Sequence, residues 1–451
     1  MATFVPNTQT EQQEMLREIG CERFEDLFSG VPENVKLPGA LDLPGGISEM
    51  EAVRHMEELA GQNRIYRSIF RGAGAYDHFI PSIVGRVVRK EKFLTAYTPY
   101  QAEISQGVLQ SIFEYQSMIC RLTGLDVSNA SVYDGASAAA EGAMMCTERG
   151  RDKILVSATA APAVREVLAT YCRGRGLTLC TIPEKDGATD LEALSQMVQA
   201  DTACAVLAQP NFFGNLEDMR RAGEILHAGG AKFVLSCDPV SLGILEMPAA
   251  LGADVAVGEG QGLGMPLAFG GPYLGFMATK KELLRRLPGR IVGETKDAQG
   301  NRAFVLTLQA REQHIKREKA GSNICSNQAL CALTAAVYLS AMGPEGLAEA
   351  ARQCTAKAHY LAEALVHAGL EMVYPQRSFF CEFVTCFPER READGEPSAE
   401  CRAEELLKKL ASCGILGGLP LGGGRILWCA TEKNTRADMD RVAEMAKEVC
   451  A

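Results

Sequence analysis

Short apolar runs alternate with amphipathic segments through the middle of the chain, from about residue 130 to residue 280. The apolar runs predict strands over residues 153–161, 177–183, 203–210, 231–238, 253–260 and 273–279. The segments between the earlier runs, residues 162–176, 190–198 and 218–230, have the apolar spacing of helices. Strands that alternate with helices in this way predict a mostly parallel sheet with helices on both faces.

Helical spacing also marks the two ends of this region. Residues 10–20 and 47–63 predict helices in an N-terminal arm, where Ser48 and Glu51 have the spacing of a capping box. Residues 105–124 predict an amphipathic helix that ends at Gly124. A helical stretch follows over residues 325–370, and the apolar runs 379–387 and 425–431 with a last helix over 435–449 predict a smaller α/β unit.

These patterns divide the 451 residues into three parts. We expect an N-terminal helical arm over residues 1–60, a large α/β domain over residues 61–340 and a small C-terminal α/β domain over residues 341–451. A chain of this length is sufficient for more than one domain around a sizeable core.

Composition narrows the class of protein. Apolar residues make up 47% of the chain and charged residues 23%, which is ordinary for a globular protein. The net charge of −10 argues against nucleic acid as a main partner, because phosphate binding needs a basic surface. No apolar run approaches the roughly 20 residues that span a bilayer, and the N-terminus has no leader-like pattern, so we expect a cytoplasmic protein without a membrane partner.

The sixteen cysteines are scattered and form no CxxC pair. We therefore expect reduced thiols that pack as small hydrophobic side chains. The six histidines are dispersed without the spacing of metal ligands, and the sequence predicts no metal site.

Polar residues follow several of the predicted strands, where ligands bind in open α/β sheets. Gly135 and Ser137 stand at a predicted helix N-terminus, which suits a phosphate, although Ser137 as an ordinary helix cap explains the pattern equally well. Asp238 follows the strand 231–238 and could pair with a protonated ring nitrogen of a cofactor or serve as a turn residue. The loop GEGQGLGMPLAFGGP, residues 258–272, is rich in glycine and lacks lysine.

A phosphate turn, a strand-end aspartate and a later glycine-rich loop occur in this order in fold-type I pyridoxal-phosphate enzymes. The last loop of those enzymes holds the lysine that binds the cofactor covalently. Gln261 stands at about that position here, and Lys280 and Lys281 come only after the next predicted strand. Because an amide cannot form an imine, the chain is not expected to be a working pyridoxal-phosphate enzyme by itself.

Longer motifs resemble one family. Residues 94–142, FRGAGAYDHFIPSIV, PNFFGNLED, GEGQGLGMPLAFGGPYLGFMAT and RAFVLTLQAREQHIKREKAGSNICSNQAL closely resemble the P-protein of the glycine cleavage system. The resemblance covers essentially the whole chain and implies a fold-type I transferase-like fold. The length and the missing lysine resemble subunit 1 of the two-chain bacterial form.

The resemblance implies a reaction and its partners. A homologous subunit 2 would hold the lysine-bound pyridoxal phosphate, in a heterotetramer of two copies of each chain. Glycine would lose its carboxylate as CO2, and the aminomethyl group would pass to the lipoyl group of the H-protein. Since sites of this fold lie at dimer interfaces, this chain is expected to complete the site of its partner.

The segment AYTPYQAE is the first candidate for that contribution. Tyr97, Tyr100 and Glu103 are the expected catalytic residues, because tyrosine hydroxyls can orient a substrate and a carboxylate can transfer protons. Thr98 and Pro99 lie between them and are the expected substrate-binding residues. An interface turn with packed tyrosines is the alternative interpretation.

The second candidate is the segment REQHIKREKAGSNICSNQ, residues 311–328. Ser322 and Asn323 are expected to approach the cofactor phosphate of the partner. A solvated charged helix or a plain subunit contact is the alternative. His78 and His314 are expected to have structural roles only.

Two rival functions remain open from the sequence. One is a self-sufficient aminotransferase or decarboxylase homodimer that uses another lysine for pyridoxal phosphate. The other is a non-catalytic structural pseudoenzyme subunit that lends no side chain to any active site.

Overall fold

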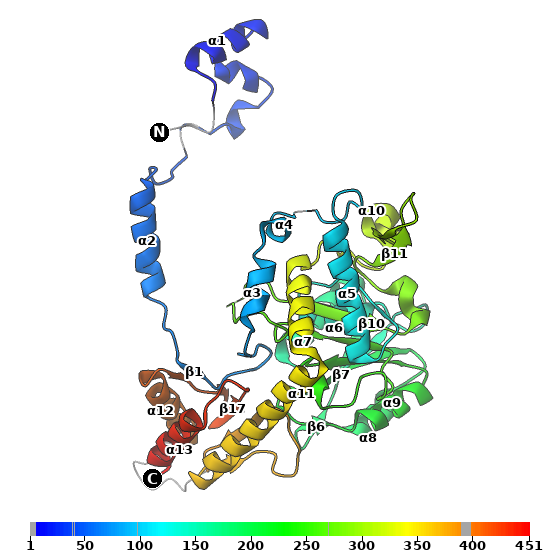
Figure 1. Ribbon diagram of the computed structural model, residues 1–451, viewed down its shortest axis with the longest axis vertical. Helices are drawn as coiled ribbons and strands as arrows, with labels where there is room; N and C mark the ends of the chain where they lie inside the picture. Colours follow the sequence, from blue (N-terminus) through cyan, green and yellow to red (C-terminus); the bar gives the residue numbers. More distant parts are fainter. Residues whose placement is uncertain (1–5, 38, 40, 97, 269, 389–397) are drawn as a thin grey trace. The chain divides into compact units, whose positions relative to one another are not determined.

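The computed structural model describes residues 6–37, 39, 41–96, 98–268, 270–388 and 398–451. The chain separates into two compact units, Met1–Arg64 and Ile65–Ala451 (Figure 1). Each unit is described by itself below.

The first unit contains the N-terminal helices. They are α1 (Gln9–Glu18), two short 3-10 helices (Phe24–Phe28 and Glu33–Val35) and α2 (Glu49–Gly61). The predicted capping box of α2 is confirmed: Ser48 Oγ accepts from the Glu51 N–H at 3.3 Å, and Glu51 Oε2 accepts from the Ser48 N–H at 2.9 Å. Thr8 and Glu11 form a second capping box at the start of α1. Each box satisfies donors that a helix N-terminus otherwise leaves unpaired.

A seven-stranded sheet forms the centre of the second unit. Its strand order is β2 (Val127–Ser128), β10 (Gly275–Thr279), β9 (Val255–Glu259), β8 (Lys232–Cys237), β7 (Thr202–Gln209), β3 (Lys153–Ser157) and β4 (Thr178–Ile182). The strands β4, β3, β7, β8 and β9 are mutually parallel, and β10 pairs antiparallel with both β9 and β2. The mostly parallel sheet predicted from the apolar runs is therefore confirmed.

Helices cover both faces of this sheet (Figure 1). Along β7, Cys204 and Val206 face one apolar cluster with α6 (Gly135–Met144) and α7 (Pro162–Arg175). Ala205 and Leu207 face the other cluster, with α8 (Leu191–Met197) and α9 (Met219–Ala228). Successive side chains of a strand point to opposite faces, so a strand buried on both sides has a continuous apolar sequence.

Two long helices pack against each other beside the large sheet, and the second of them, α11, also contacts the C-terminal part. α5 (Gln106–Thr123) ends at Gly124, whose φ of 73° is left-handed, as the sequence predicted. α11 (Ala329–His367) is interrupted at Gly343, where φ is 63° and ψ is 179°. By length and composition α11 could cross a membrane, but it packs against α5 and α13 as a core helix does.

A second, four-stranded antiparallel sheet forms the C-terminal part. Its order is β13 (Glu371–Met372), β14 (Glu382–Cys386), β17 (Arg425–Cys429) and β16 (Leu419–Gly422), with α12 (Ala399–Ser412) and α13 (Arg436–Cys450) packed on it. β15 (Ile415–Leu416) pairs with β1 (Ser68–Ile69), so the chain directly after the first unit lies against this C-terminal part. The proposed boundary between residues 340 and 341 falls near the interruption of α11 at Gly343.

The remaining elements are short. They are α3 (Ser82–Val88), α4 (Glu91–Leu94), α10 (Gln313–Lys316), the hairpin β5 (Glu184–Lys185) and β6 (Ala188–Thr189), the hairpin β11 (Val292–Lys296) and β12 (Arg302–Leu306), and short 3-10 helices at Ser241–Gly243, Lys281–Arg286, Gln309–Arg311 and Arg317–Lys319. The charged segment 311–328 is thus not one continuous helix. The sixteen cysteines all lie in the described part of the chain, and none of them is in a disulfide.

Candidate functional site

A cavity of about 420 Å³ lies where the predicted polar loops meet. The carboxyl ends of β8 and β9 and the N-terminus of α6 all contribute to its wall. The segment 209–218 contributes as well, as does the segment Gly72–Tyr76 from before α3. The wall residues with polar side chains include Tyr76, Asp134, Asn211, Asp238, Glu259, Tyr273 and Glu382. Three of these places were singled out from the sequence, namely the N-terminus of α6, the strand end at Asp238 and the start of the segment 258–272 at Glu259, and they lie at one cavity.

Carboxylates occupy the helix N-terminus that could have bound a phosphate. The Ser137 N–H donates to Asp134 Oδ1 at 2.7 Å, and the Gly135 N–H donates to Glu259 Oε2 at 3.0 Å. Asp134, not Ser137, is the cap of α6. A Cβ atom on Gly135 would lie 2.8 Å from the backbone nitrogen of Glu259, so only glycine permits this close approach. A phosphate here would face two carboxylates in place of free N–H groups.

Gln261 is buried beside the cavity, between the segment around Tyr76 and the glycine-rich loop, and its amide is fully engaged. The Tyr76 N–H donates to its Oε1 at 2.8 Å, and its Nε2 donates to the carbonyl oxygens of Tyr76 at 2.9 Å and Met265 at 2.7 Å. A lysine has no acceptor for the Tyr76 N–H. The side chain at this position therefore holds the segment around Tyr76 against the glycine-rich loop.

The two lysines after β10 lie away from the cavity. Lys280 Nζ lies 2.6 Å from Oδ1 of Asp254, which directly precedes β9. Since β10 runs antiparallel to β9, Lys280 stands at the opposite edge of the sheet from the cavity. This placement agrees with the prediction that these lysines come too late in the chain to serve the glycine-rich loop.

Asp238 is held in a turn at the end of β8. Its Oδ1 accepts from the Val240 N–H at 3.0 Å, directly before the 3-10 helix Ser241–Gly243. Burial raises the pKa of the Asp238 carboxyl, and the nearby His78 and the backbone donors oppose that shift. Burial likewise raises the pKa of Glu259, against the N–H groups of Leu274, Gly135 and Gln261 that donate to it.

Glu382 is the buried carboxyl that the sequence did not single out. It lies in β14, where the Ala73 N–H donates to Oε1 at 2.6 Å and the Tyr76 hydroxyl donates to Oε2 at 2.8 Å. Burial raises its pKa to about 7, although both donors favour the charged form. A lone acidic residue inside the apolar run FFCEFVTCF was the available signal.

The cavity does not fit pyridoxal phosphate. Its described lining residues include four carboxylates, Asp134, Asp238, Glu259 and Glu382, and no lysine or arginine. Gln261, which the sequence placed at about the position of the cofactor-binding lysine, is an amide whose side-chain hydrogen bonds are all made to the backbone. An anionic cofactor would find neither a lysine nor a positive charge there.

A second group of residues surrounds Tyr100. Its hydroxyl donates to Asn327 Oδ1, and the guanidinium carbon of Arg290 lies 4.6 Å from the centre of its ring. Asn327 Nδ2 donates in turn to Ser131 Oγ at 2.9 Å. Arg290 also pairs with the buried Glu312 at 2.9 Å. The two candidate segments of the sequence, 97–103 and 311–328, are thereby joined through side chains.

The neighbours of Tyr100 in the sequence differ in exposure. Pro99 is buried, whereas Thr98 and Glu103 are exposed. Tyr97 lies outside the described residues. Glu103 thus projects from the surface, where its carboxylate is accessible to another chain.

Ser322 and Asn323 do not line the cavity of about 420 Å³ described above. Ser322 Oγ accepts from the Ile324 N–H at 3.1 Å, and Asn323 is exposed. Ser322 lines a separate cavity of about 220 Å³ together with Glu141, Arg175 and Arg311. Burial raises the pKa of Glu141, while the Ser322 hydroxyl and Arg175 lower it.

Comparison with known proteins places this geometry in a family. The profile of the glycine cleavage system P-protein matches residues 2–443. The chain belongs to the glycine cleavage system P-protein family. It is 51% identical, over the full length of both chains, to the probable glycine dehydrogenase (decarboxylating) subunit 1 of Moorella thermoacetica. The protein of the same name from Carboxydothermus hydrogenoformans is 49% identical, over 98% of each chain.

A solved P-protein supports the same assignment. The crystal structure of a glycine decarboxylase (P-protein) of the glycine cleavage system, in inhibitor-bound form, superposes with a TM-score of 0.89 at 42% identity. It covers 99% of this chain and all of that chain. A NifS-like protein, with a TM-score of 0.62 at 14% identity over 85% of this chain and 99% of that one, shares the fold alone. The expected family and the fold-type I architecture are confirmed.

Proposed function

We propose that this P-protein chain is the lysine-free subunit of a two-chain glycine dehydrogenase (decarboxylating). The observation that carries the proposal is Gln261, whose amide stands where the lysine would be expected and makes three hydrogen bonds to the backbone of Tyr76 and Met265. The relatives are named subunit 1, which implies a second subunit. That second subunit would hold pyridoxal phosphate through a lysine.

The complete enzyme would be a cytoplasmic heterotetramer with two copies of each chain. When bound in the partner, pyridoxal phosphate withdraws the electrons that glycine releases as it loses CO2. The lipoylated H-protein would receive the aminomethyl group. Three chemical participants, glycine, the cofactor and the lipoyl group, would therefore meet at a site that this chain only borders.

This chain would lend the segment around Tyr100 to that site. Asn327 Oδ1 accepts a hydrogen bond from the Tyr100 hydroxyl and so fixes the direction of the O–H group, while Arg290 covers the ring. The Tyr100 oxygen, whose proton is donated to Asn327, would accept a hydrogen bond from the glycine amine, and Tyr97, three residues earlier in the sequence, would serve the same site. Glu103, exposed in this chain, would take or return a proton at the substrate nitrogen. Thr98 and Pro99 would shape the substrate pocket.

Ser322 and Asn323 would approach the phosphate of the partner's cofactor. The exposure of Asn323 and the half-buried position of Ser322 leave both near the surface, as this role requires. Their neighbours Arg175 and Arg311 would add positive charge on the same side.

Glycine–bicarbonate exchange in the reconstituted complex tests the proposal. The chain alone is expected to show no exchange, and addition of the lysine-bearing homologue should restore it. Tyr100→Phe and Glu103→Gln are each expected to lower the rate about 10²-fold or more, in line with the usual contribution of general acid–base groups. Glu114→Gln, an exposed change on the neighbouring helix α5, is the matched control. Full exchange in both variants within an intact complex would contradict the shared site and favour a structural subunit.

A further inference from the structure

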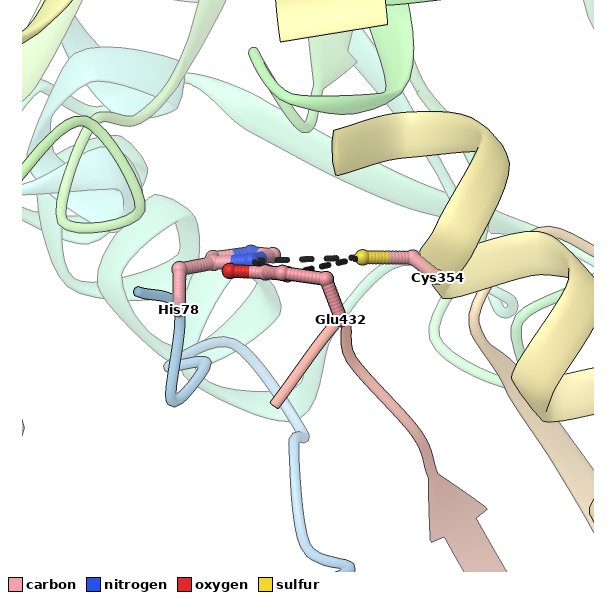
Figure 2. Close-up of side chains that lie close together, drawn as sticks. All are labelled: His78, Cys354 and Glu432. Carbon is pink, nitrogen blue, oxygen red and sulfur yellow. Dashed lines mark hydrogen bonds and ion pairs between the residues drawn. The ribbon is translucent and has the colours of Figure 1, made fainter. Parts of the chain in front are cut away.

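Three side chains from distant parts of the chain meet in the interior of the second unit. His78 comes from the segment before α3, Cys354 from α11 and Glu432 from the segment after β17, and all three point toward one another (Figure 2). His78 and Cys354 are buried, and the side chain of Glu432 is 15% exposed. The sequence predicted no metal site because its histidines are dispersed, but local spacing cannot reveal a group assembled from residues so far apart.

The three potential ligand atoms have the separations of a coordination site. His78 Nδ1 lies 2.8 Å from Glu432 Oε2, Cys354 Sγ lies 3.2 Å from the same oxygen, and Cys354 Sγ lies 4.0 Å from His78 Nδ1. The circle through these atoms has a radius of about 2.0 Å. Zinc bonds are about 2.0–2.2 Å long to nitrogen and oxygen and about 2.3 Å to sulfur. An ion slightly above the plane of the three atoms therefore meets all three bond lengths.

We propose that His78 Nδ1, Cys354 Sγ and Glu432 Oε2 bind one divalent transition-metal ion, with zinc as the best match. A thiolate, an imidazole and a carboxylate together are a typical ligand set for this borderline-soft ion. A water molecule would take the fourth position.

The charges balance when the ion binds. The Cys354 thiol gives up its proton to solvent, as does the imidazole nitrogen that faces Glu432, because metal ligands must be deprotonated. The thiolate and the carboxylate then cancel the two positive charges of the ion. A buried site of zero net charge avoids the desolvation penalty of an uncompensated ion.

The surroundings hold two of the ligands in orientation. The Phe79 N–H donates to Glu432 Oε1 at 2.5 Å, which leaves Oε2 for the cluster. Lys357 Nζ donates to the backbone carbonyl of Glu432 and so fixes that segment to α11. With Nδ1 on the metal, the ring proton of His78 must lie on Nε2, which has no hydrogen-bond partner within the described chain. The carboxylate of Asp238 is close enough to His78 for their charges to interact.

Such an ion would connect three segments of the second unit. It would tie the segment before α3 to the second half of α11 and to the end of the C-terminal sheet. The inference is independent of the glycine cleavage role, because its residues lie outside the segments proposed to serve the partner's site.

Cobalt binding to the full chain tests the site without any activity measurement. The test background replaces the three exposed cysteines, by Cys325→Ser, Cys401→Ser and Cys413→Ser, so that surface thiols do not bind metal. After chelator treatment, titration with Co²⁺ is expected to show one equivalent bound, with a thiolate-to-cobalt charge-transfer band. Zn²⁺ should displace the cobalt, abolish the band and raise the melting temperature.

Two variants and one control assign the site to these residues. Cys354→Ser keeps a hydroxyl that can donate to Glu432 but should lose the charge-transfer band. Glu432→Gln should keep the band and weaken Co²⁺ binding at least about tenfold. Cys172→Ser changes a buried thiol outside the cluster and should leave both the charge-transfer band and the affinity for Co²⁺ unchanged. Circular dichroism checks that each variant is folded. If Cys354→Ser does not fold, the titration of the parent chain tests whether one equivalent of Co²⁺ binds through a thiolate.

Either of two results would overturn the proposal. One is the lack of a stoichiometric band in the parent chain, which would make the group a hydrogen-bonded triad only. The other is a band that persists in folded Cys354→Ser, which would place the metal at another thiol.

Discussion

At the scale of single residues, Gln261 is buried between the glycine-rich loop and the segment around Tyr76. The amide of Gln261 accepts one hydrogen bond and donates two, all to the backbone. A buried polar group with every partner present is stabilising, and removal of one partner leaves the other unpaired. Gln261 therefore serves the fold as a fixed contact between two loops.

Gln261→Lys is expected to lower the free energy of unfolding by about 1–3 kcal/mol, because the buried Tyr76 N–H loses its acceptor. Urea denaturation measures this change, and Gln299→Lys in an exposed turn is the control that should remain near the parent. Absorbance after addition of pyridoxal phosphate should show no imine in the variant, since carboxylates line the cavity. A stable imine at residue 261 would contradict the proposed loss of cofactor fit.

Glu382 predicts a pH dependence with a definite sign. Its pKa is about 7 in the folded protein, above the usual 4.5, because the carboxylate is buried. The folded state then holds a proton that the unfolded state has released, so stability falls as pH rises from about 4.5 to about 7. This difference between the pKa values of Glu382 in the folded and unfolded states corresponds to about 3 kcal/mol of unfolding free energy.

The variant Glu382→Gln isolates this contribution. Its free energy of unfolding, measured from pH 5 to pH 8, should rise relative to that of the parent as the pH increases. Two curves that stay parallel across that range would show that Glu382 titrates normally. Asp201→Asn, at a partly exposed carboxylate, serves as the control.

Some of these residues could be identified from the sequence and others could not. The missing lysine and the polar residues after the strands were visible, because a strand end and a glycine-rich loop have local signatures. The sequence offered Ser137 as a cap of α6, whereas the structure shows that Asp134 is the cap and accepts the N–H of Ser137. Serine and aspartate both cap helices, so the sequence does not distinguish between them. Glu382, Asn327 and the His78 cluster depend on contacts between segments far apart in the chain, which local patterns do not encode.

At the scale of elements, the apolar runs were sufficient for the central sheet. All six strands predicted between residues 153 and 279 are present, because strands buried on both faces must be apolar throughout. The hairpin β11–β12 was not predicted, since its strand β11 is mostly exposed and has no apolar run. A continuous charged helix was one interpretation of the segment 311–328. The structure instead has short helices there, and Arg317, with a φ of 54°, interrupts them.

Gly107 inside α5 and Gly124 directly after it give a matched test of how this helix ends. Gly124 has a φ of 73°, and an added Cβ would lie 3.0 Å from Ala249 Cβ, so Gly124→Ala should cost about 1–2 kcal/mol. Gly107 lies near the helix start in open space, so Gly107→Ala should be neutral or stabilise by up to about 1 kcal/mol. Thermal unfolding of both variants measures the difference, and equal effects would contradict the assigned left-handed cap.

At the scale of the whole molecule, the chain retains the architecture of a pyridoxal-phosphate enzyme without a site that fits the cofactor. The cavity still lies at the carboxyl edge of the sheet, where this fold binds its ligands. The proposed contribution to catalysis has moved to the segment around Tyr100, which Asn327 and Arg290 hold in place. A family in which two homologous chains divide these tasks accounts for both observations.

Borohydride reduction of the assembled complex, followed by peptide mapping, tests this division most directly. The reconstituted enzyme is loaded with pyridoxal phosphate and reduced, so that any lysine bound to the cofactor carries a stable pyridoxyl group. We predict a single labelled lysine, in the glycine-rich loop of the partner subunit, and no label on this chain. A stoichiometric pyridoxyl group on any lysine of this chain would contradict the proposal and identify it as a self-sufficient enzyme.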